Sequence, residues 1–225
     1  MTETHQKTLN RAPSEKPAAT AVKRGYHHGN LREALLVAAE ELIAEVGPAG
    51  FTLADACRRA GVSTAAPYRH FEDRNALLAA VCMRGFEALA RTTGEAKASL
   101  PPGTIESILA GSRGYLTFAL ENPERFKLMF GRQPDITSKP QVEQTGRDCF
   151  GNLLDAVSAF LEREGRGGED PMPLALRIWA LVHGVASLVL EGPLEVIAPG
   201  NDPGSIIDQA GRAILEGERH RAVGD

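Results

Sequence analysis

The sequence predicts an all-α fold of about nine helices, with a three-helix N-terminal unit followed by a larger helical bundle. Its 225 residues include 32 alanines and 24 leucines against 12 valines and 9 isoleucines, a balance that favours helices over sheets. Apolar residues in the first regular segment recur at the spacing of an amphipathic helix. No stretch alternates apolar and polar residues for long enough to build a sheet.

The sequence predicts where the first two helices begin and end. One spans residues 31–46 and stops at Gly47, because glycine commonly follows the last turn of a helix. Thr52 is the predicted N-cap of a short second helix over residues 53–60, with Asp55 at the third helical position.

A third helix is predicted over about residues 64–71, and a longer fourth one begins after Asp73 as N-cap. Pro67 fits only the first turn of the third helix, because further along it would lose a hydrogen bond and clash with the preceding turn. Five more helices are expected in the remainder of the chain, at about 104–120, 123–131, 141–164, 173–191 and 204–218.

Charge is unevenly distributed along the chain. The net charge is −4 overall, +1 over residues 1–75 and −5 over the remainder. Lys23 and Arg24 stand beside Tyr26 with no acidic residue close by, which makes a locally positive arm. Such an arm could contact a polyanion, and it could equally serve solubility alone.

Several classes of protein are disfavoured by the sequence. The longest run without a charge, residues 178–190, has 13 residues, short of the roughly 20 that cross a bilayer, and no secretory signal is visible. Cys57, Cys82 and Cys149 form no CxxC pair, so we expect reduced thiols, with a redox-sensor role left open. These features indicate a cytoplasmic protein with no metal, cofactor or membrane contact.

A short second helix, a turn containing Gly61 and a compact third helix form a helix-turn-helix pattern. The amides at the start of the second helix, next to Thr52, suit a phosphate. The third segment offers several hydrogen-bonding side chains, namely Ser63, Thr64, Tyr68, Arg69 and His70. The alternative is a plain bundle in which these residues form an exposed polar face.

The segments 51–53 (Phe-Thr-Leu), 60–63 (Ala-Gly-Val-Ser) and 68–74 (Tyr-Arg-His-Phe-Glu-Asp-Arg) follow one another in order. Together they resemble the N-terminal signature of the TetR/AcrR family of bacterial transcriptional regulators. The resemblance implies that Thr64 and Ala65 reach base edges and that Arg74 clamps the DNA backbone. The full set of DNA-binding residues that it implies is Lys23, Arg24, Tyr26, Thr52, Ser63, Thr64, Ala65, Tyr68, Arg69, His70 and Arg74. Pro67 departs from the bulkier apolar residue often found at its position in the family.

The resemblance also implies an organisation and a function. Residues 1–22 would be a flexible leader, 23–75 a helix-turn-helix DNA-binding domain, and 76–225 a ligand-binding and dimerisation domain. A homodimer would bind an inverted-repeat operator in double-stranded DNA, most often as a repressor, and a small molecule in the C-terminal domain would release it. The effector, the operator sequence and the choice between repression and activation are not encoded in these motifs.

The segment 173–191 is apolar on two helical faces, which indicates burial on two sides. One face would lie against its own domain and the other against a partner subunit, together with residues of the last helix. The predicted dimer interface is Leu174, Ile178, Leu181, Val185, Leu188, Ile206, Ile207, Ala210 and Ile214. A central core helix in a monomer is the alternative.

Trp179, His183 and Gly184 resemble the signature of the WHG class of C-terminal domains in this family. Small-molecule sites are lined by apolar and aromatic side chains, so we predict an apolar or aromatic effector. The candidate ligand-binding residues are Tyr115, Phe118, Phe126, Met129, Phe150, Trp179 and His183. Each is alternatively core filler, and His183 is alternatively a core histidine bonded within the protein.

Enzyme motifs are missing from the sequence. It contains no HExxH, GxGxxG or P-loop pattern, and Ser112 stands in a near match to a nucleophile elbow without the preceding strand. The prediction is therefore that the protein is not an enzyme. The competing hypotheses are an all-α carrier or enzyme without specific DNA binding, and a DNA-binding regulator controlled by a protein partner.

Overall fold

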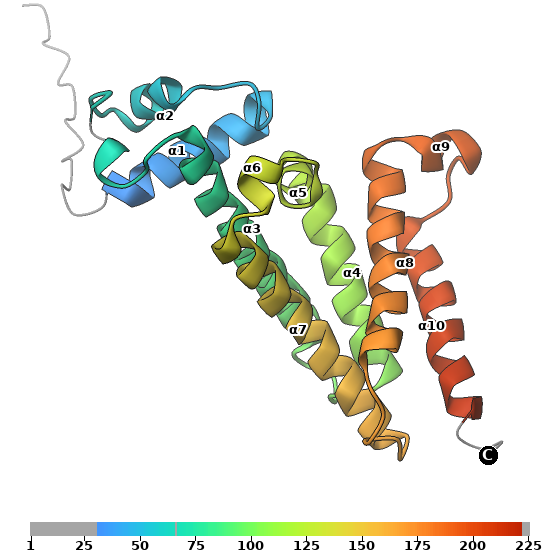
Figure 1. Ribbon diagram of the computed structural model, residues 1–225. Coiled ribbons are helices and arrows are strands. Elements are labelled where there is room, and N and C mark those ends of the chain that lie inside the picture. The colour runs from blue at the N-terminus through green and yellow to red at the C-terminus, as the bar shows by residue number, and fades with distance from the viewer. Residues whose placement is uncertain (1–30, 66, 222–225) are drawn as a thin grey trace, which may run out of the picture. The chain divides into compact units, whose positions relative to one another are not determined.

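The computed structural model describes residues 31–65 and 67–221, and helices are its only regular elements in that range (Figure 1). This confirms the predicted all-α fold. The elements are α1 (Leu31–Val46), α2 (Leu53–Ala60), the 3-10 helix η1 (Pro67–Arg69), α3 (Arg74–Lys97), α4 (Ile105–Glu121), α5 (Pro123–Phe130), α6 (Pro134–Thr137), α7 (Pro140–Arg163), α8 (Met172–Leu190), α9 (Pro193–Ile197) and α10 (Pro203–Arg221).

The predicted third helix is the main departure from the expected elements. In place of a helix over 64–71, the structure has the single 3-10 turn Pro67–Arg69. Pro67 has no N–H to donate and its ring excludes a helical turn before it, so helical structure can begin only at this residue. The short helices α6 and α9 were not expected.

Helix α2 is short because both of its ends are capped. Thr52 accepts a hydrogen bond from the Asp55 backbone, and the Asp55 carboxylate accepts one from the Thr52 backbone, which confirms the predicted N-cap. Gly61 ends the helix with φ of 69°, a left-handed conformation that favours glycine. The chain then turns directly into the segment before η1.

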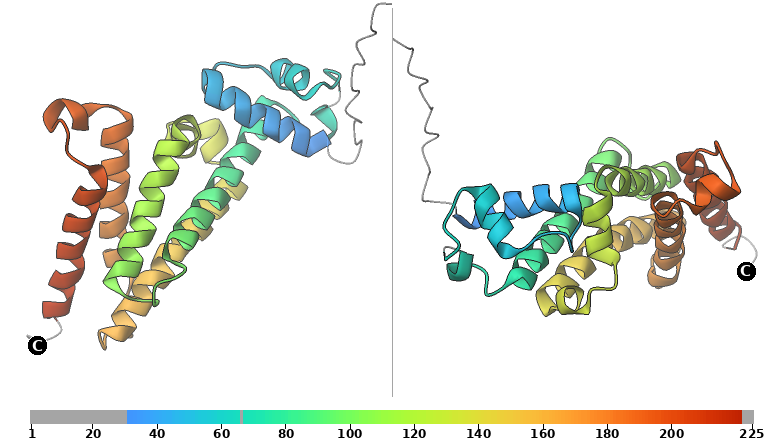
Figure 2. Two further views of the ribbon diagram at one scale, coloured as in Figure 1. Left: turned by 180° about the vertical axis from the view of Figure 1, so that it is seen from behind. Right: turned by 90° about the horizontal axis from the view of Figure 1, so that it is seen from above.

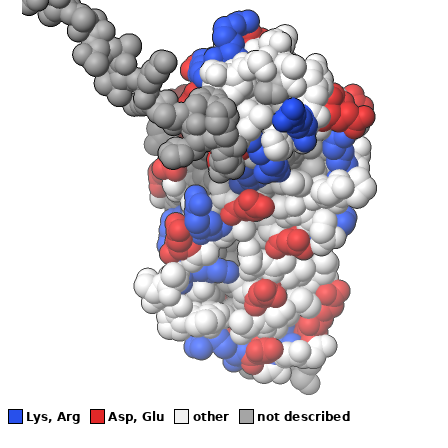
Figure 3. Space-filling model, turned by 90° about the vertical axis from the view of Figure 1, so that its left-hand side faces the viewer, with Lys and Arg blue, Asp and Glu red and all other residues white. Residues whose placement is uncertain are grey.

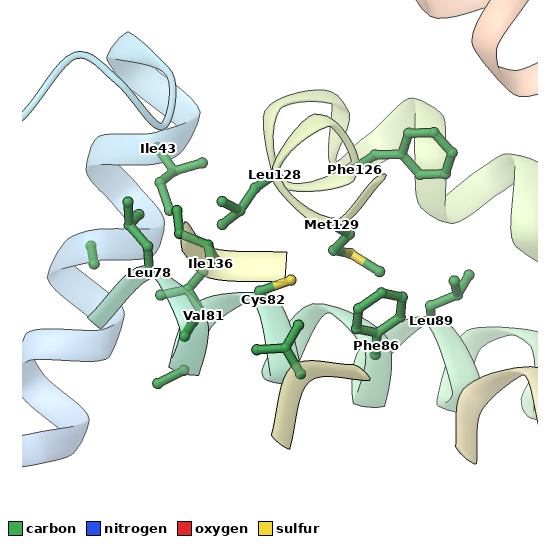
Figure 4. Close-up of a cluster of buried hydrophobic side chains, with 14 of the residues drawn as sticks. Ile43, Leu78, Val81, Cys82, Phe86, Leu89, Phe126, Leu128, Met129 and Ile136 are labelled. Atoms are coloured by element: carbon green, nitrogen blue, oxygen red, sulfur yellow. The ribbon is translucent and has the colours of Figure 1, made fainter. Parts of the chain in front are cut away.

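A continuous hydrophobic core joins the N-terminal helices to the bundle. Ile43 of α1, Leu78 and Val81 of α3, and Leu128 of α5 meet in one buried cluster (Figure 4). Because α3 belongs to both parts, the expected boundary at residue 75 falls in its first turn. A second buried cluster, centred on Phe160, holds α4, α7, α8 and α10 together further along.

Helices α8 and α10 lie side by side next to α4 (Figure 2). By length and composition α8 could cross a bilayer, with a mean hydropathy of 1.7 over 18 residues. Its charge-free stretch is shorter than the helix because Arg177 interrupts it. Packing explains the apolar character of one of its faces, since Leu174, Ile178 and Val185 are buried inside the chain.

Candidate DNA-binding and effector sites

The residues that follow α2 form an exposed recognition turn, defined as residues 63–65 and 67–70. Every residue in it except Pro67 is exposed, and Tyr68 is 65% exposed. An exposed tyrosine beside a charged and a polar side chain, here Arg69 and His70, gives hydrogen-bond donors suited to phosphate and sugar oxygens.

Two buried side chains hold the recognition turn on the N-terminal unit. Pro67 is buried and Phe71 is only 4% exposed. The backbone N–H groups of His70 and Phe71 both donate to the Pro67 carbonyl at 2.8 Å. The neighbouring side chains Tyr68 and Arg69 therefore project from a tightly bonded turn.

Thr52 lies at the N-terminus of α2, where it is exposed. Its hydroxyl group donates to the Asp55 carboxylate at 2.6 Å, and this bond lowers the Asp55 pKa. Arg58, 77% exposed at the side chain and paired with Asp55 at 3.0 Å, is a basic residue of the same helix that the sequence predictions omitted. Its position in the last turn of the helix that precedes the recognition turn could have identified Arg58 as a candidate from the sequence.

Arg74, predicted to clamp the DNA backbone, is half-buried and bonded within the protein. Its Nε donates to the Phe51 carbonyl at 2.7 Å and a terminal nitrogen donates to the Pro48 carbonyl. The guanidinium group also lies 5.1 Å from the centre of the Phe51 ring. Arg74 therefore ties the start of α3 to the loop between α1 and α2, and we expect a positioning role for it, while the predicted contact with the DNA backbone stays a prediction.

A cavity of about 560 Å³ lies among α3, α4, α5, α7 and α8. Of the predicted ligand-binding residues, Tyr115, Phe150 and Trp179 line it. Phe118, Phe126 and Met129 do not line it and pack within the surrounding core, at 2 to 3% exposure. Spacing alone could not separate the two groups, since both fall on apolar helix faces.

His183 stands behind the cavity wall. Its Nδ1 lies 2.8 Å from the Tyr115 hydroxyl group, and its ring stacks on Phe126 at 5.5 Å between centroids. Burial lowers the His183 pKa, so the neutral ring is favoured and can accept the hydrogen bond. The structure thus agrees with the core-histidine alternative, and it places His183 in contact with wall residues.

Comparisons with known proteins agree with this geometry. A family model described as bacterial regulatory proteins, tetR family, matches residues 35–81. A second, described as tetracyclin repressor-like, C-terminal domain, matches residues 108–212. The chain belongs to the TetR family. The WHG class of its C-terminal domain stays a prediction.

Solved structures include several relatives of this TetR-family chain. A protein with unknown function from Rhodococcus is 30% identical, covering 87% of this chain and 98% of that one, with a TM-score of 0.75. The TetR-family regulator PfmR from Thermus thermophilus is 18% identical (81% and 97% covered, TM-score 0.55). FadR from Bacillus subtilis, solved with stearoyl-CoA, is 14% identical (83% and 98% covered, TM-score 0.61). A search of curated proteins gives no match.

Four of the nine predicted dimer residues of this TetR-family chain are turned inward. Leu174, Ile178, Val185 and Ile207 are at most 6% exposed within one chain, so they are not available to a partner subunit. Leu181, Ile206, Ala210 and Ile214 are half-buried, and Leu188 is exposed. These five residues leave part of the predicted interface open to a partner, and the interface itself stays a prediction.

Acid should destabilise this TetR-family protein in part through His183. Its folded-state pKa lies below the ordinary 6.5, so the unfolded state binds more protons and stability falls as pH drops below about 6.5. We expect the loss of melting temperature on acidification to be smaller in His183→Gln. The exposed His70→Gln is the matched control, and an equal pH response in all three proteins would contradict the expectation.

Proposed function

We propose that this TetR-family regulator is a homodimeric repressor that binds an inverted repeat and is released by a small molecule in the C-terminal cavity. One observation carries the proposal. Helix α3 begins at Arg74, directly after the recognition turn, and the same helix lines the cavity with Phe86, Leu89, Thr93 and Lys97. A ligand that shifts α3 would move the recognition turn with it. Its site of action would be the cytoplasm, where bacterial DNA lies.

Tyr68, Arg69 and His70 would contact the DNA backbone, and Thr64 and Ala65 would reach base edges with Ser63 beside them. Phosphate contacts supply salt-dependent affinity, whereas base contacts supply specificity. Thr52 would support a phosphate at the start of α2. Lys23, Arg24 and Tyr26, which lie outside the described residues, are proposed as an additional backbone-contacting arm. Figure 3 shows basic side chains among acidic ones on one face of the molecule.

A second connection joins the cavity to the N-terminal helices. Phe130 of α5 lines the cavity, and Arg125 of the same helix lies 3.6 Å from the carboxylate of Glu40 on α1. Glu40 is 15% exposed and also pairs with Arg84 of α3 at 3.2 Å. This cluster places α1, α3 and α5 in one charged network, so displacement of α5 by a ligand would be transmitted to α1.

Dimerisation is assigned to the outward face of α8 instead of the buried one. Ala180 and Leu188 are exposed on that face, and a Cβ added at Gly184 would meet nothing within 4 Å. Gly217 of α10 is equally open. Small and apolar residues on two adjacent helices allow the corresponding helices of a partner to approach closely, as in a four-helix interface.

Ala180→Arg should therefore yield a monomer. A guanidinium group in the centre of a packed apolar interface is buried without a partner, and this penalty exceeds what the interface gains elsewhere. Light scattering coupled to size exclusion measures the mass. Ala98→Arg, the same change at an exposed residue after α3, should leave the dimer intact. A dimer of Ala180→Arg would exclude this face.

Titration of the protein with its own upstream DNA at two salt concentrations tests the proposed function. We expect tight, salt-sensitive binding that survives competitor DNA, with two protomers per site. An all-α carrier or enzyme would bind the upstream duplex and an unrelated duplex equally weakly. A regulator controlled by a protein partner would bind its operator, and no small molecule would release it.

A further inference from the structure

We propose that the cavity binds an elongated amphipathic anion, with the anionic group at Lys97 and the apolar body lying toward Phe86 and Phe130. The inference rests on the proposed function, because it names the chemical class of the effector. Two features of the cavity support it, namely the sign of its charges and the distance along α3 between Lys97 and a cluster of aromatic side chains.

The charged residues on the cavity wall are both cationic. They are Lys97 and Arg147, and within the part of the chain that the structure describes no Asp or Glu side chain lines the cavity. A cationic ligand would therefore meet repulsion without a compensating carboxylate. An anion would find its counter-charge in the wall.

Lys97 is the better placed of the two. It is the last residue of α3 and half-buried, and its ammonium group donates to the Asn152 backbone carbonyl at 3.1 Å. No carboxylate among residues 31–65 and 67–221 forms an ion pair with it, and the exposed Asp155 acts on it only from further away. Because an ammonium group has three donors, two of them can serve a ligand. Burial lowers the Lys97 pKa, as expected of a cation held in apolar surroundings.

Arg147 is already bonded to residues of its own helix, and its side chain lies nearer the solvent. Its guanidinium group donates to Gln144 at 3.0 Å and pairs with Glu143 at 3.6 Å, and 61% of its side chain is exposed. These contacts leave it less in need of a ligand anion than Lys97. They make it a competing position that the experiment has to separate.

An aromatic end of the cavity lies away from Lys97 along α3, and Arg147 lies toward this end, since its neighbour Gly146 faces the Phe86 ring. Phe86 and Lys97 are 11 residues apart, which corresponds to about 16 Å of helix. At the Phe86 end, the Phe86 and Phe130 rings meet edge to face at 5.5 Å between centroids, and Tyr115 lies 6.3 Å from Phe130. An elongated apolar body would fill this aromatic end while its anionic group reaches Lys97.

Three probes with one chain length and different head groups test the proposal, namely dodecanoate, 1-dodecanol and dodecylamine below their micelle concentrations. Trp179 is the single tryptophan of the sequence and lines the cavity, so its fluorescence reports binding directly. Dodecanoate should bind at least about tenfold more tightly than dodecanol, and dodecylamine should bind more weakly still. Equal affinity for the acid and the alcohol overturns the proposal.

Variants locate the anionic group. Lys97→Met keeps most of the side-chain length and should abolish the preference for dodecanoate, whereas Lys97→Arg should retain it. Lys127→Met is the matched control, because Lys127 is exposed on α5 and absent from the cavity wall. Loss of the preference in Arg147→Met but not in Lys97→Met would overturn the assignment of Lys97.

The proposed regulator function is tested separately by DNA titration without any probe. Specific DNA binding with no binding of the three probes overturns this ligand class and leaves the regulator proposal intact. Selective binding of dodecanoate without specific DNA binding supports the ligand class and overturns the regulator proposal in favour of a carrier.

Discussion

Alanine at Arg69 should weaken operator binding by about a hundredfold or more, because the charge-assisted contact is lost twice in a dimer. Arg69 is exposed on the recognition turn. The dependence of affinity on salt should also become shallower, by about two units in the log–log slope, since each protomer gives up one phosphate contact. Fluorescence anisotropy with labelled operator at several salt concentrations measures both quantities.

Tyr68→Ala should lower the affinity to a similar degree without changing the salt dependence, because the tyrosine carries no charge. The two substitutions therefore separate hydrogen bonding from phosphate neutralisation at neighbouring positions. Arg91→Ala is the matched control, since Arg91 is 69% exposed on α3 and pairs with Glu95 of its own helix. If Arg69→Ala and Arg91→Ala bound operator equally well, the recognition turn would not be the DNA-binding element.

The positions of most helices, and of the caps at the ends of α2, could be predicted from the sequence. Helix α1 begins and ends at the predicted residues, and Thr52 caps α2 as expected. Both features depend on neighbours within four residues along the chain, which is the range over which helical spacing and capping act. The family resemblance depends on the same local segments, and the comparisons confirm it.

Features that depend on distant segments were predicted less well. Phe126 and Trp179 both fall on apolar faces, but Phe126 packs on Tyr115 and His183 in the core, whereas Trp179 meets Phe150 at the cavity wall. The same holds for α8, where α4 and α10 cover the face of Ile178 and leave that of Ala180 exposed. Lys97 was missed because a lone lysine at a helix end is ordinarily a solvated residue.

Replacing Arg74 with alanine should strongly destabilise the folded protein. Arg74→Ala removes two hydrogen bonds to backbone carbonyls and the contact with the Phe51 ring. The Phe51 and Pro48 carbonyls would lose their donors in a partly buried place, so we expect a loss of about 2 to 4 kcal/mol in the free energy of unfolding. Chemical denaturation measures it, and operator affinity should fall because the recognition turn loses its anchor.

Arg74→Lys separates the positioning role from direct contact with DNA. A lysine keeps the charge and could replace an arginine on a phosphate, but it lacks the planar fork that bonds two carbonyl groups at once. We therefore expect Arg74→Lys to lose most of the stability that Arg74→Ala loses, with a similar loss of operator affinity. Wild-type stability together with wild-type affinity in Arg74→Lys would return this residue to the DNA-contacting set. An Arg74→Ala variant that is unstable but whose salt dependence is unchanged would show that the guanidinium group neutralises no phosphate and acts inside the protein, holding α3 against the loop before α2.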